Sequence, residues 1–218
     1  MRAVDLYCGL GGWSDGLADV GFEIIGVEIR EDLANLYQHP VIVADVRELN
    51  PVEFSGYDLI IGSPPCRDFS LQALCAFRKG NPWRIPPDPE GHGMDLVNAF
   101  LRFVEIAKPK FWLMENVTQL TKYLTLLYKM KVKISGNKWR CFWGNFPRFD
   151  VPYHPEILMD YSGKLRSEKN AYIPPDIGRS LGLAIIEELY KGGSTEIEEK
   201  YYEIALNKCR QIEMQLGV

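Results

Sequence analysis

The stretch DLYCGLGGWS at residues 5–14 decides the expected fold of this chain. An apolar run over residues 3–8 is typical of a buried strand, and it leads directly into a glycine-rich turn. Ser14 can cap the helix that we expect to follow over residues 14–20. Glycines let the backbone pass close to a ligand, and the start of a helix favours negative charge. The stretch therefore predicts a nucleotide-like ligand at the turn.

Short apolar runs alternate with helical segments through the first half of the chain. We expect further strands over residues 23–29, 41–45, 59–63 and 111–114, and helices over residues 31–37 and 95–107. This alternation predicts an α/β fold, a doubly wound and mostly parallel sheet with helices on both faces.

The second half is less regular. Residues 131–135 and 140–146 predict an antiparallel hairpin at the sheet edge, and helices are expected over residues 176–190 and 195–216. Residues 67–93 and 147–175 are rich in proline and are expected to be loops. We expect a single domain over residues 1–218.

The composition is that of a soluble globular protein, because 46% of the 218 residues are hydrophobic and 25% are charged. This excludes wholesale disorder and a fibrous repeat, and no apolar run reaches the roughly 18–20 residues of a membrane span. We expect no signal peptide and a cytoplasmic location. The five cysteines contain no CxxC pair and the three histidines are isolated, so neither a disulfide framework nor a metal site is expected.

Two further strand ends carry carboxylates. Glu28 lies about twenty residues beyond the glycine turn, where an acidic side chain can accept hydrogen bonds from ribose hydroxyls. Asp45 ends the next strand and can hold an adenine amino group. The alternative is that both residues only cap the helices that follow. Three successive strand ends with suitable groups favour a nucleoside site.

A cysteine and a glutamate follow the next two strands. Cys66 lies in GSPPCRDFS at residues 62–70, and Glu115 lies in MENV at residues 114–117. Ligands bind at the carboxyl edge of such sheets. A lone cysteine is more often a small buried hydrophobe, but the paired prolines argue against that interpretation. The two residues suggest a nucleophile and a proton donor.

The glycine loop, Pro-Pro-Cys and Glu-Asn-Val, in this order and at these spacings, resemble the C5-cytosine-specific DNA methyltransferase family. The resemblance covers residues 3–146 and resumes near residue 172. It implies a Rossmann-like methyltransferase fold, S-adenosyl-L-methionine as the cofactor, and methyl transfer to carbon 5 of cytosine in DNA through a covalent cysteine adduct. The alternatives are cytosine methylation of RNA and a partner-dependent regulatory subunit that binds the cofactor.

The resemblance also implies residue roles. Cys66 would attack carbon 6 of a flipped base, Glu115 would act at ring N3, Asn116 would support the site, and Arg140 would reach the cytosine carbonyl. The cofactor would be held by Tyr7, Gly9, Gly11, Gly12, Glu28, Ile29, Asp45, Val46, Pro65 and Leu96.

The chain departs from the family pattern in three places. The final cofactor motif is replaced by Ile-Gly-Arg-Ser at residues 177–180, and only Arg140 of the family's arginine cluster is clearly in place. Asn145 to Tyr172, the stretch between these two motifs, has fewer than thirty residues, too few for the independently folded base reader that the family carries there. We therefore describe residues 1–146 as the cofactor-binding and catalytic core, 147–175 as a minimal substrate-side segment, and 176–218 as helices packed on the core. Sequence specificity is expected to be low, or supplied by residues 67–93 or by a separate specificity protein.

Residues 117–149 contain no acidic side chain, although the whole chain has a net charge of −4. This stretch is either a solvated strand edge or a surface that tracks a nucleic-acid backbone. Its basic residues are Lys122, Lys129, Lys131, Lys133, Lys138, Arg140 and Arg148.

Overall fold

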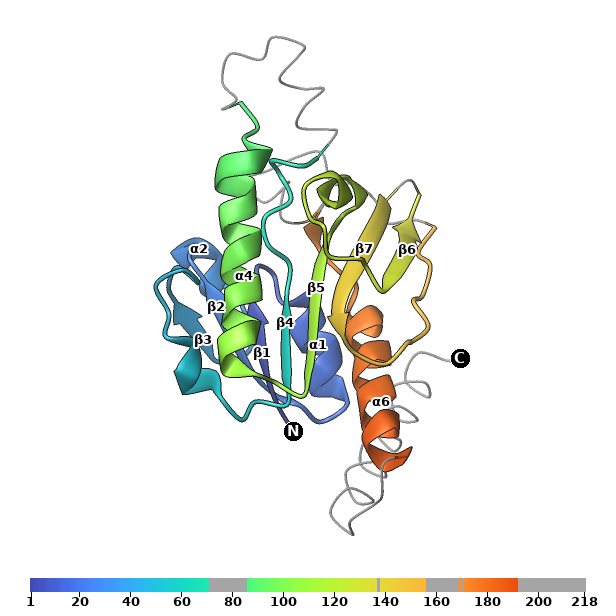
Figure 1. Ribbon diagram of the computed structural model, residues 1–218. Coiled ribbons are helices and arrows are strands. Elements are labelled where there is room, and N and C mark those ends of the chain that lie inside the picture. The colour runs from blue at the N-terminus through green and yellow to red at the C-terminus, as the bar shows by residue number, and fades with distance from the viewer. Residues whose placement is uncertain (71–85, 137, 156–168, 170, 192–218) are drawn as a thin grey trace.

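The computed structural model describes residues 1–70, 86–136, 138–155, 169 and 171–191. Over these residues the chain forms one seven-stranded sheet with the order β3-β2-β1-β4-β5-β7-β6, and helices cover both of its faces (Figure 1). The expected α/β fold with a mostly parallel sheet is confirmed.

Five strands of the sheet are parallel. They are β1 (Arg2–Leu6), β2 (Glu23–Glu28), β3 (Val41–Val43), β4 (Leu59–Gly62) and β5 (Phe111–Val117). Leu6 pairs with Val27 on one side and with Gly62 on the other, and Gly62 pairs in turn with Met114. The carboxyl ends of β1, β2 and β4 are therefore nearly level, and β5 continues beyond them. The chain order reverses between β1 and β4, which is where ligands bind in open sheets of this kind.

One face of the sheet is covered by α1 (Gly12–Asp19) and α6 (Pro175–Lys191). These two helices pack closely because Gly12 and Gly16 have no side chain. A Cβ atom at either glycine would lie 1.8 Å from a backbone oxygen, that of Ile173 or of Pro175. The core under this face includes the buried side chains of Trp13 and Leu17.

The other face is covered by α4 (Met94–Ala107), together with the short helix η1 (Pro51–Phe54) (Figure 1). Its core contains Phe100 and Phe103, which are fully buried. The apolar spacing that predicts a helix over residues 95–107 is thus explained by burial of one helix face against the sheet.

The expected hairpin is present as β6 (Met130–Ser135) and β7 (Lys138–Asn145). Strand β7 runs antiparallel to β5 and attaches the hairpin to the sheet. Phe142 and Phe146 are fully buried, so these two aromatic residues belong to the core.

Several boundaries differ from the expectations. Helix α2 spans only Glu31–Ala34, so it ends before Tyr37. The Tyr37 ring packs over Gly26, where a Cβ atom would lie 2.6 Å from it. Strand β5 is longer than expected because its pairing with β7 continues to Val117, which lies opposite Arg140. This extension places Glu115 inside a strand.

The segment expected as a loop before α4 also contains helical structure. Residues Pro89–Gly93 form a π-helical turn, η2, which is capped by the carboxylate of Asp88. A second short turn, η3 (Thr118–Lys122), follows β5. Residues 71–85 and the helix expected over residues 195–216 lie outside the described part of the chain. Within that part, no helix is both long and apolar enough to cross a membrane.

Candidate active site

Cys66 lies four residues beyond the end of β4, at the carboxyl edge of the sheet. The residue is half-buried, and its backbone carbonyl accepts a hydrogen bond from the amide of Phe69, which closes a tight turn. Burial raises the pKa of the Cys66 thiol, and the neighbouring Glu115 raises it as well, while Arg140 opposes both effects. The thiol is therefore protonated at neutral pH in this state.

Glu115 and Arg140 form an ion pair beside this cysteine. Arg140 Nε lies 2.7 Å from Glu115 Oε1, and the two side chains are only 6% (Glu115) and 11% (Arg140) exposed. Burial raises the pKa of Glu115, whereas Arg140 and a hydrogen bond from Ser63 act to lower it. The sheet thus brings together three of the four residues expected to be catalytic: a thiol, a carboxyl group and a guanidinium.

Asn116, the fourth residue expected to be catalytic, is hydrogen bonded to the backbone and not to the other three. Its Nδ2 donates to the backbone oxygen of Pro64 at 2.9 Å, and its Oδ1 accepts from the amide of Val117 at 2.8 Å. The residue is fully buried. It therefore braces the Pro-Pro-Cys turn against β5 and holds Cys66 in position.

Two residues that the sequence did not single out complete this cluster. Trp13, at the start of α1, donates its indole Nε1–H to Ser63 Oγ at 3.1 Å. Ser63 lies beside Glu115, because Gly62 and Met114, the residues before them, are paired in the sheet. No pattern in the sequence indicates this connection, because Trp13 and Ser63 are fifty residues apart.

On the expected cofactor side, Glu28 holds the glycine loop. Its two carboxylate oxygens accept hydrogen bonds from the amides of Gly9, at 3.0 Å, and Arg30, at 2.9 Å. Gly9 and Gly11 both have positive φ angles, of 52° and 83°, which favour glycine. The loop is thus shaped by residues with no Cβ atom and tied to the end of β2.

Asp45 is paired within its own turn. Arg47 donates to its carboxylate through the backbone amide and the guanidinium, and this hydrogen bonding lowers the pKa of Asp45. Val46 between them is buried, whereas Ile29, directly after β2, is 60% exposed. Ile29 is therefore open to solvent directly beside Glu28, at the position where the sequence predicts the nucleoside.

Tyr7 and Leu96 meet across the same edge. The Tyr7 hydroxyl donates to the backbone oxygen of Leu96 at 2.9 Å, and Leu96 itself lies in the first turn of α4. Pro65 is exposed beside Cys66. Gly12 differs from the other residues of the expected cofactor set. Glycine is needed there for packing, because a Cβ atom would collide with the backbone oxygen of Ile173.

A buried carboxyl group beneath the glycine loop was also missed by the sequence. Asp5 is 1% exposed, and its Oδ2 accepts a hydrogen bond from Ser14 Oγ at 2.6 Å. Ser14 Oγ is also 2.6 Å from the Tyr37 hydroxyl, whereas Asp5 Oδ1 has no hydrogen-bond partner among the described residues. Burial raises the pKa of Asp5 to about 7. Ser14 therefore serves this network rather than the cap that the sequence suggested, since no side chain in the described ranges caps α1.

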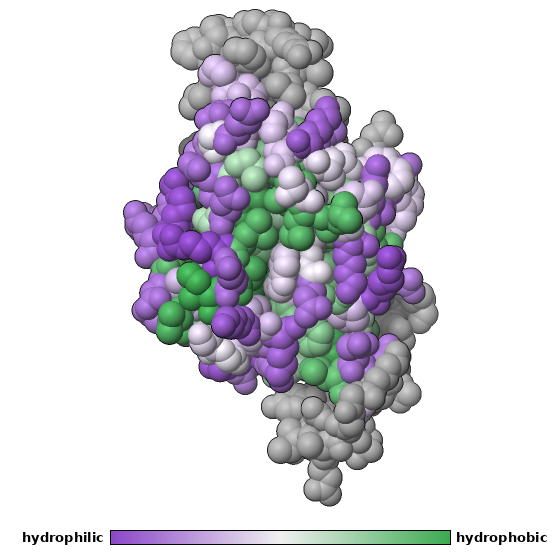
Figure 2. Space-filling model, viewed as in Figure 1, coloured by the Kyte–Doolittle hydropathy of each residue, from purple (hydrophilic) through white to green (hydrophobic). Residues whose placement is uncertain are grey.

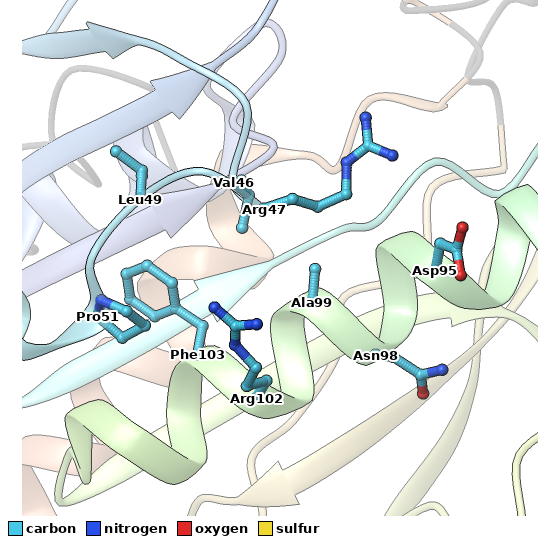
Figure 3. Close-up of a pocket in the computed structure, with 9 residues that line it drawn as sticks. All are labelled: Val46, Arg47, Leu49, Pro51, Asp95, Asn98, Ala99, Arg102 and Phe103. Carbon is cyan, nitrogen blue, oxygen red and sulfur yellow. The ribbon is translucent and has the colours of Figure 1, made fainter.

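A pocket of about 290 Å³ lies between α4 and the residues that follow Asp45 (Figure 3). It is lined by Val46, Arg47, Leu49, Pro51, Asp95, Asn98, Ala99, Arg102 and Phe103. Figure 3 shows the Arg47 and Arg102 guanidinium groups pointing in different directions, so they do not form a joint anion site. Only Val46 belongs to the expected cofactor set, and the catalytic cluster lies elsewhere. No group of three or more His, Cys, Asp or Glu residues in the described ranges could hold a metal ion.

A sequence model of the C-5 cytosine-specific DNA methylases matches residues 1–134 of the chain. The chain belongs to this family. The matched residues include the glycine loop, Cys66, Glu115 and Asn116, and they end before Arg140. The assignment of Arg140 therefore rests on its geometry in this structure.

Individual relatives are type II methyltransferases. M1.HphI from Haemophilus parahaemolyticus is 33% identical over 132 residues, which cover 55% of this chain and 33% of that protein. M.DdeI from Desulfomicrobium norvegicum is 37% identical over 128 residues, 54% of this chain and 28% of that protein. M.HgiGI from Herpetosiphon aurantiacus is 31% identical over 129 residues, 54% of this chain and 90% of that sequence. The chain thus spans about a third of the length of the first two relatives.

Proposed function

We propose that this family member transfers a methyl group from S-adenosyl-L-methionine to carbon 5 of cytosine in DNA. The observation that carries the proposal is the convergence of Cys66, Glu115 and Arg140 at one sheet edge, next to the glycine loop. A thiol, a buried carboxyl group and a guanidinium are the groups needed to add to a pyrimidine ring and to balance the charge that develops on it.

Cys66 is the proposed nucleophile. After losing its proton, its sulfur forms a bond to carbon 6 of a base turned out of the helix, and the electrons of the 5,6 double bond shift toward carbon 5. Because burial raises the pKa of the thiol, its proton must leave as the carbon–sulfur bond forms, and the positive charge of Arg140, which acts to lower this pKa, favours the thiolate. Carbon 5 would take the methyl group that the bound cofactor supplies. Transfer of the carbon 5 proton to a base then re-forms the 5,6 double bond, and the carbon 6–sulfur bond breaks to release Cys66 as the thiolate.

Glu115 stabilises the adduct. The raised pKa of this carboxyl group favours its protonated form, which can donate a hydrogen bond to ring N3 and draw electrons away from carbon 6. Arg140 keeps the carboxyl group in place through the 2.7 Å contact and has remaining N–H donors for the cytosine carbonyl. When bound, the cofactor supplies an electrophilic methyl group.

The cofactor fits the residues present at the β1–β2 side of the edge. Ile29 offers an exposed apolar surface, Glu28 a carboxylate at the ribose position, and the glycine loop an open backbone. Asp45 and Val46 would meet the adenine edge, with Tyr7, Leu96 and Pro65 closing the site.

The substrate surface is expected to include the basic hairpin, but its charges do not form one patch. Lys133 pairs with Trp139 and Val132 with Arg140, and neighbouring residues of a strand face opposite sides. Lys131 and Lys133 therefore lie on the opposite face of the hairpin from Arg140. Their ammonium groups lie 5.4 and 5.5 Å from the rings of Trp139 and Tyr153, all of which are exposed.

We further propose that sequence choice is weak in the isolated chain. The outer surface on the α4 side of the molecule is mostly hydrophilic around patches of apolar side chains (Figure 2). Residues 147–155 form no helix or strand that could enter a DNA groove and read its bases. Specificity is then supplied by residues 67–93 or by a separate protein, and the enzyme acts in the cytoplasm. An RNA substrate and a regulatory role are the rivals, and the complete Cys66–Glu115–Arg140 cluster argues against a silent subunit.

The decisive experiment measures methyl incorporation into matched DNA and RNA pools, with trapping on DNA that contains 5-fluorocytosine. The wild-type chain is expected to label DNA and to form a covalent complex. Cys66→Ala should lower turnover by more than about 10³-fold and form no complex, yet still bind the cofactor, since the nucleophile acts on the base. Cys141→Ala is the matched control, because Cys141 is buried in the core. Substantial turnover by Cys66→Ala, or labelling of RNA alone, contradicts the proposal.

A further inference from the structure

Ser63 links the helix that follows the glycine loop to the carboxyl group of Glu115. It lies directly after β4 and is half-buried. Its Oγ is 3.1 Å from Trp13 Nε1. Gly62 pairs with Met114, so the next residues along the two parallel strands, Ser63 and Glu115, lie side by side, and a hydrogen bond from Ser63 acts to lower the pKa of Glu115. The indole of Trp13 is 3% exposed and packs edge-on against Phe142, with ring centroids 5.7 Å apart.

The direction of these hydrogen bonds follows from the chemistry of the groups. An indole nitrogen is a donor only, so the Ser63 oxygen must accept from Trp13. The hydroxyl group has a single hydrogen, and the carboxylate of Glu115 is the acceptor next to it. Trp13 therefore directs the Ser63 hydrogen toward Glu115, and a hydroxyl that would otherwise rotate is held in one orientation.

Arg140 holds Glu115 from the other side. Its Nε lies 2.7 Å from Oε1, so the carboxyl group sits between a guanidinium from β7 and a hydroxyl from the end of β4. A carboxyl group with two fixed donors has little freedom to rotate, which limits the direction in which it can meet a base.

We infer that Ser63 is a positioning residue for Glu115 and that Trp13 acts through Ser63 to fix the orientation of that carboxyl group. Trp13 follows Gly12 directly, so the chain Trp13–Ser63–Glu115 also connects the glycine loop to the catalytic cluster. The inference rests on the proposed function for its catalytic meaning, but the hydrogen-bond chain can be tested without turnover.

The test titrates Glu115 by ¹³C NMR of carboxyl-labelled glutamate, with Glu115→Gln to identify its signal. Ser63→Ala removes a donor to the ionised carboxylate, so the midpoint should move to higher pH. Trp13→Phe keeps Ser63 but releases its hydroxyl, and it should move the midpoint in the same direction by a smaller amount. Ser63→Thr retains the hydroxyl group and should restore the wild-type midpoint. Ser55→Ala, at an exposed position after η1, is the control and should change nothing.

The kinetic readout is the pH profile of methyl transfer. Ser63→Ala is expected to lower kcat by about 10-fold and to move the profile with the Glu115 midpoint, while the KM for the cofactor stays unchanged. A Glu115 midpoint that is the same in the wild type, Ser63→Ala and Trp13→Phe overturns the inference. If the wild type transfers no methyl group but the midpoints move as expected, the proposed function fails and the hydrogen-bond chain stands.

Discussion

Charged and titratable groups on the two halves of the carboxyl edge differ in their burial and in their partners. On the β1–β3 half, Glu28 and Asp45 are each satisfied by neighbouring residues of their own segment or by backbone amides. On the β4–β7 half, Glu115 is buried and Cys66 is half-buried, and the charge of Arg140 acts on both. The first half is preorganised as a polar scaffold, whereas burial in the second half raises the pKa values of two acidic groups. A binding region needs the former property and a reacting region needs the latter.

Asp5 is the exception in the binding half. It is as buried as Glu115, but within the described part of the chain Ser14 is its hydrogen-bond partner and no arginine or lysine pairs with it. The two buried carboxyl groups therefore differ in their partners: Glu115 has a cation beside it and Asp5 has a hydroxyl group.

The largest effect is expected from breaking the buried ion pair. Arg140→Met leaves the Glu115 carboxyl group buried without its cation and should lower the free energy of unfolding by about 3–5 kcal/mol. Adding Glu115→Gln should recover most of this stability but no methyl transfer. Chemical denaturation measures both, and Arg148→Met, at an exposed position, is the control. If Arg140→Met costs no more than the control, the pair does not organise this half.

The next effect concerns pH. With the pKa of Asp5 raised to about 7, the folded chain keeps a proton that the unfolded chain loses near pH 4. The contribution of Asp5 to the free energy of unfolding should therefore be greatest below pH 4. It should fall as the pH rises from 4 to 7 and level off above pH 7. Asp5→Asn should remove this dependence.

The difference between the wild type and Asp5→Asn is expected to change by roughly 3–4 kcal/mol between pH 4 and pH 8. Denaturation at a series of pH values measures it, with Asp150→Asn at an exposed position as the reference. Parallel stability curves for the wild type and Asp5→Asn would show that Asp5 ionises normally in the fold.

A smaller effect is expected from the binding half. Glu28→Ala removes the acceptor for the Gly9 and Arg30 amides and should weaken cofactor affinity by about 1–3 kcal/mol. Calorimetric titration with S-adenosyl-L-methionine measures the loss. Glu31→Ala, in the first turn of α2, is the control. Equal affinities in the two variants would mean that Glu28 serves only the loop and not the ligand.

The smallest effect is expected at the hairpin. Reversal of Lys131 and Lys133 to glutamate should weaken DNA binding to all sequences alike. The slope of log affinity against log salt should become shallower by about 1 for each of these lysines that neutralises a phosphate. Arg102→Glu with Lys108→Glu, at α4, is the charge-matched control. A weakening confined to one DNA sequence, or an equal weakening in the control, contradicts a backbone-tracking role for this face.

Much of the architecture followed from local patterns. Apolar runs of strand length, separated by an amphipathic helix such as α4, are enough to specify a parallel sheet, because such strands must be buried on both faces. The order of the motifs then placed Gly9, Cys66 and Glu115 at one edge, since the carboxyl ends of parallel strands meet there. Family membership was equally accessible, because it depends on residue types at fixed spacings.

Tertiary structure alone decided how these residues are connected. Strand register brings Arg140 within reach of Glu115. The close packing of α1 against the sheet brings Trp13 to Ser63 and Ser14 to the buried Asp5. The separation of Lys131 from Arg140 depends on the pleat of the hairpin. Such contacts join residues distant in the chain, and a local pattern contains no information about which side chain lies opposite another once the strands are paired.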